Sequence, residues 1–321
     1  MVTTVTLGAL AGAVVAAVFA ADVYGPRFGF YLVPPSVEKY AQLAVERLDG
    51  GYHANDPEWP AKRAAILDAA RSASEYAELY PLLQEGTQIA GGRHSSFVPA
   101  GTGSAAAESS AQPTVDTDAG VTTIVLPEMV SSRAEELQSY ATTVADGIDR
   151  AAADTCGWVI DLRGNRGGNM YPMLSGIAAL LPDGVALSFV DRGGNATAVT
   201  IEPRGAAIAG NVMVDVGAHE KLAGRPIAVL QDEWTASSGE AVLASFRGVE
   251  GARTFGADSA GYTSANVSRT LFDGATISLT ESVYVDRTGR NYEEGPIAPD
   301  QTSTQDDADA RAWLGEQGCV G

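Results

Sequence analysis

Positive charge is scarce in this chain of 321 residues, which contains 21 lysines and arginines against 40 aspartates and glutamates. The formal net charge of −19 argues against a nucleic-acid partner, because phosphates require a basic surface. Anionic substrates are disfavoured for the same reason, unless the arginines are clustered. A cationic ligand would instead be favoured by long-range electrostatic steering.

Cysteine and histidine are also scarce, and their spacing argues against two common kinds of site. The two cysteines, Cys156 and Cys319, match neither a disulfide scaffold nor a zinc site. They could pair if the domain is exported, or remain two free thiols. The three histidines, His53, His94 and His219, are scattered without metal-ligand spacing, so we expect no metal and no cofactor.

The N-terminal segment Val5–Ala21 has no charged residue and lies near the short limit for a membrane span, which needs about 20 residues. A cleaved signal peptide is the alternative, since the small residues near its end would suit cleavage. Neither interpretation has its usual positive charge ahead of the apolar run. The apolar character continues toward Pro35, which favours a single-pass anchor over residues 1–24, with the rest of the chain outside the cytoplasm. A buried core helix is the third interpretation.

With 45% hydrophobic and 19% charged residues, the composition is that of a globular protein of about two domains, and no internal repeat is present. Residues 31–92 contain three helical patterns, the first capped by Ser36 and the second by Asp56, with Pro57 in its first turn. We predict that this range forms a helical bundle. Residues 93–130 are predicted to form a histidine-bearing loop and a small β cap.

Strands and helices alternate from Gly120 onward, which predicts an α/β core with parallel strands over residues 131–305. A polar hairpin insertion at about 186–222 is expected to contribute to the cap, and residues 306–321 to form a C-terminal tail. Ligands bind such sheets beyond the carboxyl ends of the strands. Two polar turns, "RGNRGG" and "TASSGE", lie at such ends. Together they indicate a site more strongly than either turn alone.

The second turn places Ser237 and Ser238 where a buried strand meets an amphipathic helix. Serines are common N-caps, but a helix N-terminus can also hold a nucleophile and stabilise the oxyanion that it creates. A nucleophilic serine needs a base, and histidine titrates in the required range. His94 follows a glycine hinge in "AGGRHSSF", whereas His53 lies in a helix-connecting loop and His219 beside the insertion. Each histidine taken alone is more typical of a surface or hydrogen-bonded residue.

The strings "VIDLRGNRGG" and "TASSGE" resemble the two motifs of the tail-specific (C-terminal processing) and tricorn-core serine peptidases. The resemblance implies a crotonase-like (ClpP/crotonase-type) protease core, with Ser237 as nucleophile three residues before Glu240. The tail-specific branch uses a lysine base about 25 residues further on, where this chain has Tyr262, and no lysine follows Lys221. The tricorn-like branch uses a histidine from an N-terminal element, which corresponds to His94.

A longer series of motifs resembles a membrane-anchored branch of this family, in the same order and at similar spacing, between about Tyr31 and Asp300. The series is "YLVPPS", "GGRHSSF", "DLRGNRGG", "LLPDG", "SSGE", "DSAGYTSAN" and "DRTGRNY". The resemblance implies that a Ser/His dyad cleaves a cationic, ring-bearing bacteriocin peptide, such as the lantibiotic nisin, near its C-terminus. The peptide substrate would lie in a groove between a cap and the protease core.

The resemblance also implies roles for backbone groups at the two turns. The N–H groups of Ser238 and Gly168 are expected to hold the oxyanion, with Gly167 as the alternative to Gly168. Glycine suits this turn because the backbone must approach the substrate closely. By their position just past the glycines, Asn169 and Met170 are expected to line the groove.

Three further sets of residues complete the predicted site. Glu293, beside Glu294 in "YEEGPIAPD", is either a third catalytic residue, as in the tricorn-like enzymes, or a solvated side chain. Asp161 and Arg163 are expected to fix the glycine turn rather than react. The pair Ser95–Ser96 either orients the preceding histidine or simply hydrogen-bonds the loop.

Two other functions fit parts of the pattern. A protein that binds a bacteriocin or envelope peptide without cutting it, as an immunity protein would, could keep the groove but would not need the Ser/His pair. A crotonase-like enzyme acting on acyl thioesters would share the core fold, but would have no use for a membrane anchor or for Ser237. The serine peptidase accounts for more of the sequence than either of these.

Overall fold

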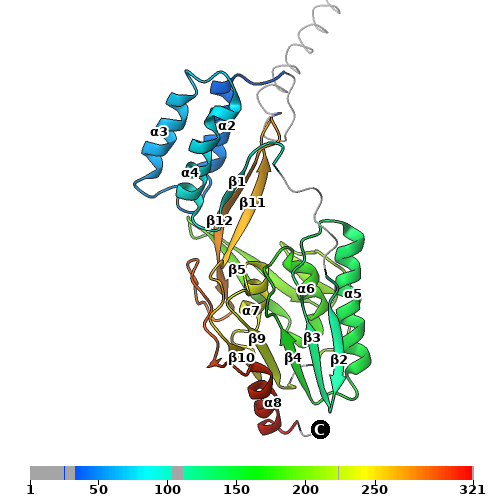
Figure 1. Cartoon of the computed structure of the whole chain (residues 1–321). Coiled ribbons are helices and arrows are strands. Elements are labelled where there is room, and N and C mark those ends of the chain that lie inside the picture. Colours follow the sequence, from blue (N-terminus) through cyan, green and yellow to red (C-terminus); the bar gives the residue numbers. More distant parts are fainter. Residues whose placement is uncertain (1–24, 26–32, 103–110, 223, 320–321) are drawn as a thin grey trace, which may run out of the picture. The chain divides into compact units, whose positions relative to one another are not determined.

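The computed structural model describes residue 25 and residues 33–102, 111–222 and 224–319. The chain divides into two units (Figure 1): Met1–Gly103 with Asn266–Glu281, and Ser104–Ala265 with Ser282–Gly321. The expected membrane anchor over residues 1–24 lies outside the described residues. Within the described part of the chain, no helix has both the length and the apolar character that a membrane span requires.

The smaller unit begins with the helices that the sequence pattern predicts. They are α2 (Val37–Leu48), α3 (Trp59–Ala69), the 3-10 helix η2 (Tyr76–Leu79) and α4 (Tyr80–Gly91). Ser36 caps α2, accepting a hydrogen bond from the Lys39 N–H. The predicted start of the second helix at Asp56 and Pro57 is wrong, because Pro60, not Pro57, occupies the first turn of α3. Asp56 instead closes a turn through its carbonyl.

Three strands complete the smaller unit, and two of them come from late in the sequence. β1 (Ser96–Val98) pairs antiparallel with the first part of β12 (Thr276–Asp286), and β11 (Ser264–Thr270) also pairs with β12. Between β11 and β12, the Asp273 carboxylate accepts hydrogen bonds from the hydroxyl groups of Tyr40 and Tyr80. The segment 266–281 therefore belongs with the N-terminal helices, which the sequence pattern did not predict.

The larger unit contains a six-stranded sheet in the order β13-β10-β9-β4-β3-β2. Its strands are β2 (Thr114–Asp118), β3 (Val121–Val125), β4 (Gly157–Asp161), β9 (Ile227–Gln231), β10 (Ala252–Gly256) and β13 (Gln301–Thr302). All neighbouring strands are parallel except the β2–β3 pair. The predicted mixed α/β architecture is confirmed. β2 and β3, which we expected in a cap, pair with the core sheet.

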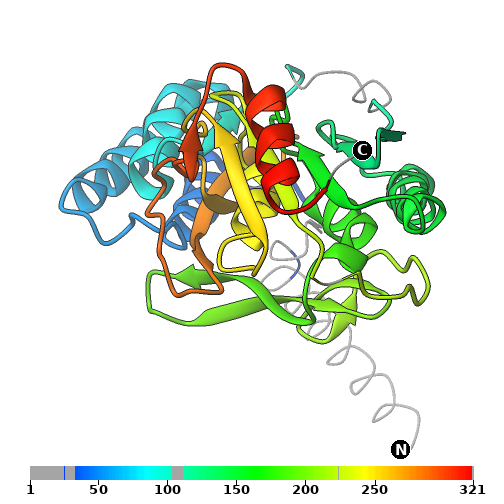
Figure 2. The same ribbon diagram turned by 90° about the horizontal axis from the view of Figure 1, so that it is seen from below.

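Both faces of this sheet are buried, as the continuous apolar strands β4 and β9 require. On one face, Trp158 and Ile160 pack in the core that includes α5 (Ala134–Ala151), α6 (Met170–Gly176) and α7 (Ser238–Ser245). On the other face, Val159 packs with Leu314 of α8 (Asp306–Glu316), drawn in red in Figure 2. α8, in the predicted C-terminal tail, therefore packs against the core sheet.

An antiparallel meander occupies the predicted hairpin insertion. It consists of β5 (Gly184–Asp191), β6 (Ala196–Glu202), β7 (Gly205–Ile208) and β8 (Asn211–Val212). The last part of β12, from Ser282 to Asp286, pairs with β5. β12 thus brings its C-terminal residues into the larger unit.

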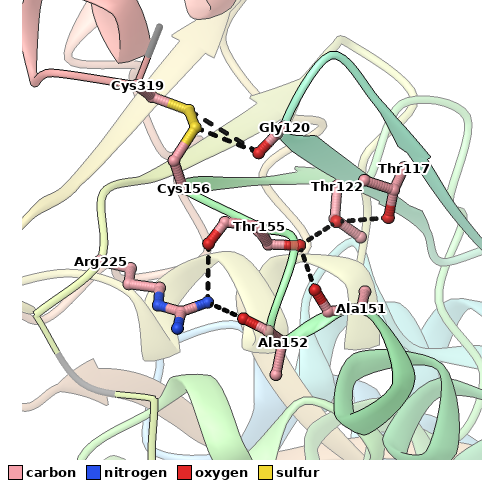
Figure 3. Close-up of a disulfide and its surroundings, with 9 residues drawn as sticks. All are labelled: Thr117, Gly120, Thr122, Ala151, Ala152, Thr155, Cys156, Arg225 and Cys319. Carbon is pink, nitrogen blue, oxygen red and sulfur yellow. Dashed lines mark hydrogen bonds between the residues drawn. A yellow bond between two sulfur atoms is a disulfide. The ribbon is translucent and has the colours of Figure 1, made fainter. Parts of the chain in front are cut away.

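Cys156 and Cys319 form a disulfide, which decides between the two states that the sequence left open (Figure 3). Their Cα atoms are 5.1 Å apart although 163 positions separate them in sequence. Beside the bond, Arg225 donates hydrogen bonds to the carbonyl groups of Ala152 and Thr155. The disulfide ties the end of α8 to the start of β4. Cross-links of this kind typically stabilise a fold by about 2–4 kcal/mol.

Candidate active site

Two turns meet at the carboxyl ends of the neighbouring parallel strands β4 and β9. The first turn covers residues 162–169 and the second covers residues 232–237, leading into α7. Hydrogen bonds join them: the Ala236 N–H to the Asn165 carbonyl at 2.9 Å, and Ser238 Oγ to the Gly168 carbonyl at 2.6 Å. Thr235 Oγ1 also donates to the Leu162 carbonyl at 2.9 Å. The two motifs therefore form one site at the edge where α/β sheets bind ligands.

Ser237 is the N-cap residue of α7 and has an unusual backbone conformation, with φ 52° and ψ −115°. Positive φ is uncommon for a residue other than glycine, and such strain costs on the order of 1–3 kcal/mol. Its side chain is half-buried. Strained residues cluster at functional sites, which makes this conformation an indication of function.

Glycine is required at position 167 because the two turns pack closely there. Gly167 has φ 108°, and a Cβ atom at this position would lie 2.8 Å from Ser237 Cβ and 3.0 Å from the Ser238 nitrogen. Its neighbour Gly168 has φ 97°, and a Cβ there would lie 2.0 Å from the Met129 carbonyl oxygen. Larger residues would force the turns apart.

The backbone N–H groups at these turns differ in availability. The Gly167 N–H donates to Asn165 Oδ1 at 2.9 Å, so it is already engaged. Within the described residues, the N–H groups of Gly168 and Ser238 have no hydrogen-bond acceptor. Gly168 is therefore the better of the two glycine candidates for binding an oxyanion, together with Ser238 at the helix N-terminus.

Two residues beside Ser237 lie outside the site that the sequence predicts. Glu240 is completely buried, and its carboxylate accepts the Ser237 N–H at 2.8 Å. The spacing Ser-x-x-Glu, typical of a capping box, was the available signal for this contact. Tyr284, from β12, is also buried in the core. Burial raises the pKa of Tyr284, and an interaction with the Ser237 side chain opposes part of that rise.

Trp234 and Arg166 form an exposed pair on the two turns. The Arg166 guanidinium lies 4.7 Å from the centre of the Trp234 ring, and Trp234 is 52% exposed. A cation held over an aromatic face is stabilised by the ring quadrupole. The pair therefore places an exposed aromatic ring three residues before Ser237, with a cation from the neighbouring turn over it.

His94 belongs to the smaller unit, where it follows the end of α4. It is half-buried, and its carbonyl accepts a hydrogen bond from Asn266 Nδ2 at 2.7 Å. Thr280 Oγ1 in turn donates to Asn266 Oδ1 at 2.6 Å. Ser95 Oγ donates to the Gly91 carbonyl and accepts the Thr280 N–H, so Ser95 fixes the loop. Ser96, the first residue of β1, is exposed.

The other two histidines interact with aspartates close to them. His53 Nδ1 lies 3.4 Å from Asp56, three residues away. His219 Nδ1 lies 2.6 Å from Asp149 Oδ2, and its Nε2 lies 2.7 Å from the Val216 carbonyl oxygen. Both contacts are those of histidines that stabilise local structure.

The predicted third catalytic residue lies on an exposed turn. Glu293 has φ 49° and an exposed side chain, and its backbone N–H donates to Asn291 Oδ1. The adjacent Glu294 is half-buried and accepts a hydrogen bond from Ser264 Oγ at 3.1 Å. Two consecutive residues with positive φ indicate a tightly fixed turn.

The remaining predicted residues have structural contacts. Asn169 caps α6 by accepting the Tyr171 N–H, and its side chain is half-buried. Met170 is only 5% exposed and packs in the core, which leaves little of its side chain to line a groove. Arg163 pairs with Asp161 at 2.6 Å and with Asp307 of α8 at 2.9 Å. The hydrogen bonds that Arg163 donates to Asp161 raise the pKa of its guanidinium, and the ion pair with Asp307 joins the turn to α8.

The fold and these two turns define a class of protein. The family model for "Peptidase family S41" matches residues 120–303, and the chain belongs to this family. It is 32% identical over 308 residues to the nisin-resistance protein of Lactococcus lactis subsp. lactis, covering 94% of this chain and 95% of that protein. The resemblance predicted from the motifs is confirmed.

Solved structures agree with this assignment. A lipoprotein from Streptococcus agalactiae is 27% identical, with a TM-score of 0.77 over 89% of this chain and 99% of that chain. The photosystem II D1 C-terminal processing protease is 14% identical, with a TM-score of 0.57 over 85% of this chain and 94% of that chain. At that identity the second comparison shows a shared fold alone.

Proposed function

We propose that this chain is a serine endopeptidase that cleaves cationic peptides of the lantibiotic class, such as nisin. The observation that carries the proposal is the strained Ser237 at the start of α7, beside the available N–H groups of Ser238 and Gly168. Similarity to a nisin-resistance protein over most of both chains supports the choice of substrate. The net charge of −19 suits a cationic peptide.

In the proposed mechanism, Ser237 Oγ attacks the carbonyl carbon of the scissile peptide bond while His94 accepts its proton. The negative charge that develops on the carbonyl oxygen is stabilised by the N–H groups of Ser238 and Gly168. As the C–N bond breaks, the protonated His94 gives its proton to the leaving amine. A water molecule, deprotonated by His94, then attacks the acyl-enzyme ester; as the bond from the acyl carbon to Ser237 Oγ breaks, His94 returns the proton to Oγ and the free carboxylic acid leaves.

We further propose that the protein works outside the cytoplasm, held at the membrane by residues 1–24, and that its core is of the crotonase type. The Cys156–Cys319 disulfide supports export, because disulfides persist in oxidising compartments. Fractionation of cells that express the full chain tests this part. Protease-accessible protein on the outer surface is expected, and a wholly cytosolic protein would refute the proposal.

The catalytic proposal is tested by incubating the chain from residue 25 onward with nisin and with uncharged control peptides, followed by mass spectrometry. We expect one cleavage near the C-terminus of nisin. Ser237→Ala and His94→Ala should each abolish cleavage while thermal unfolding stays cooperative. Peptide that is bound but left intact by the wild-type protein would instead identify a non-cleaving binding protein. Cleavage by Ser237→Ala would show that the nucleophile is wrong.

A further inference from the structure

A completely buried carboxylate lies in the first turn of α7, and the proposed mechanism does not use it. Glu240 is 0% exposed and accepts four hydrogen bonds. Burying an ionised carboxylate is costly unless its oxygen atoms are fully hydrogen-bonded. The donors that bind the Glu240 carboxylate show which segments it holds in place.

The two oxygen atoms of Glu240 divide the donors between two segments. Oε2 accepts the Ser237 N–H at 2.8 Å and the Tyr262 N–H at 2.7 Å. Oε1 accepts the Gly261 N–H at 2.7 Å and the Ser259 hydroxyl. Ser259 Oγ itself accepts the Ile297 N–H at 2.8 Å, so its own proton is directed toward Glu240. Four donors converge on an acceptor, which is the arrangement that an ionised carboxylate satisfies best.

One of these four donors is the nucleophile's own backbone. Ser237 has φ 52°, and strained conformations persist only where surrounding contacts over-determine them. Glu240 binds the N–H of this residue directly, and Gly167 leaves the space that its Cβ atom needs. Among the residues that the structure describes, the adjacent Ser238 N–H at the helix N-terminus has no acceptor. Glu240 therefore fixes the backbone from which the hydroxyl and one oxyanion donor project.

The other donors belong to the turn 259–262, which follows β10. Besides its bonds to Glu240, this turn donates the Ala260 N–H to the Thr235 carbonyl at 2.9 Å. The same carboxylate thus joins the turn to the N-terminus of α7. This is the turn in which the lysine-dependent relatives would place their base, and here it carries Tyr262 in that position.

We propose that Glu240 is the positioning residue of the nucleophile: its carboxylate holds Ser237 in the strained conformation and locks the turn 259–262 against α7. The inference rests on the proposed serine-peptidase function. Glu240 is buried beneath the site and does not reach substrate. Its loss should therefore lower the rate of the chemical step and leave peptide binding largely unchanged.

The test is Glu240→Gln, which keeps the shape of the side chain but replaces one acceptor oxygen with an amide donor. We expect kcat for nisin cleavage to fall about 100-fold, similar to the loss of one oxyanion donor, with KM within about twofold of wild type. Labelling of Ser237 by a fluorophosphonate probe should slow by a similar factor, because it needs the same nucleophile geometry without peptide binding. Ser259→Ala, which removes one donor and leaves the three backbone donors in place, should cost less than about tenfold.

Asp300→Asn is the matched control. Asp300 also accepts from a backbone N–H, a hydroxyl group and an arginine, at Thr254 and Arg247 of the larger unit. The Asp300→Asn substitution should lower the unfolding temperature without changing kcat or the rate of probe labelling. If Glu240→Gln fails to fold, Glu240→Asp replaces it, since the shorter side chain stays ionised but cannot span both segments.

Wild-type kcat and labelling rates in a folded Glu240 variant would overturn the positioning role. Weaker peptide binding alone, measured as a higher KM with kcat preserved, would overturn the positioning role as well. Both results leave the serine-peptidase proposal standing. That proposal fails separately if the wild-type protein neither cleaves peptide nor reacts with the probe at Ser237.

Discussion

The segments that carry Ser237 and His94 are held in place in different ways. Ser237 has a strained backbone, packs against Gly167 without space for another atom, and is hydrogen-bonded to a buried carboxylate. Around His94 only Gly92 has a positive φ, and the loop is fixed by the side chains of Asn266 and Ser95. The nucleophile is therefore set by local backbone geometry. The histidine loop is instead set by polar contacts of the His94 carbonyl and of Ser95, next to it, with the distant residues Asn266 and Thr280. The first arrangement should tolerate less change.

The largest effect is expected at Ser237 itself. Ser237→Ala and Ser237→Gly both remove the hydroxyl and should lower cleavage by about 10³-fold or more. They should differ in stability, because glycine adopts positive φ freely and alanine does not. We expect Ser237→Gly to be more stable than Ser237→Ala by about 1 kcal/mol in chemical denaturation. Equal stabilities would show that the backbone at this position is not strained.

Gly167→Ala is expected to have the next largest effect. The added Cβ would meet Ser237 Cβ at 2.8 Å and would sit on a residue with φ 108°. A displacement of the nucleophile by up to about 1 Å should lower kcat about 100-fold. The backbone strain at position 167 should lower the free energy of unfolding by about 1–3 kcal/mol.

Gly164→Ala is the control for this prediction, since Gly164 has φ 71° in the same turn and nothing within 4 Å of an added Cβ. It should cost about 1–2 kcal/mol from its φ alone and leave kcat near wild type. An equal loss of activity in both variants would mean that the turn as a whole, not the Gly167–Ser237 contact, controls the nucleophile.

Asn266→Ala tests the other side of the comparison. The substitution removes the hydrogen bond to the His94 carbonyl and the one from Thr280. Because these bonds act on the loop rather than on the reacting atoms, we expect kcat to fall about tenfold and stability by about 1 kcal/mol. Asn211→Ala, which removes a side-chain bond within its own surface turn, should leave both unchanged. A loss as large as that of Gly167→Ala would remove the distinction between the two segments.

The same contrast explains how much could be predicted from the sequence. The Ser237 turn is built from residues close together in the chain or in two adjacent parallel strands, so motif spacing and the αβ pattern were sufficient to predict it. The setting of His94 depends on Asn266, 172 residues away, and on Thr280 beyond it, in a hairpin that the sequence pattern assigns to the core. The burial of Met170 and the role of Pro60 in α3 also depend on packing, which local patterns do not specify.

His219 provides the smallest expected effect and a check on which histidine serves catalysis. Burial lowers the pKa of His219, but hydrogen bonds to the Asp149 carboxylate and the Val216 carbonyl outweigh it, with Asp146 adding a further attraction, and the net shift is upward. Both ring nitrogens face acceptors, so the protonated imidazole satisfies the site. A pKa raised in the folded state means that this stabilisation is fully present below the unfolded value, about 6.5, and is lost as pH rises through the folded pKa.

The unfolding temperature of the wild type should therefore fall between pH 6 and pH 9 by more than that of His219→Gln, which cannot titrate. Cleavage at a fixed pH should be the same in the two proteins, because His219 stabilises the contact between α5 and the segment after β8 and takes no part in the proposed chemistry. If His219→Gln lost cleavage and kept the pH dependence of its unfolding temperature, the base would have to be sought at His219 instead of His94. A difference confined to stability keeps the two histidines in separate roles, one structural and one catalytic.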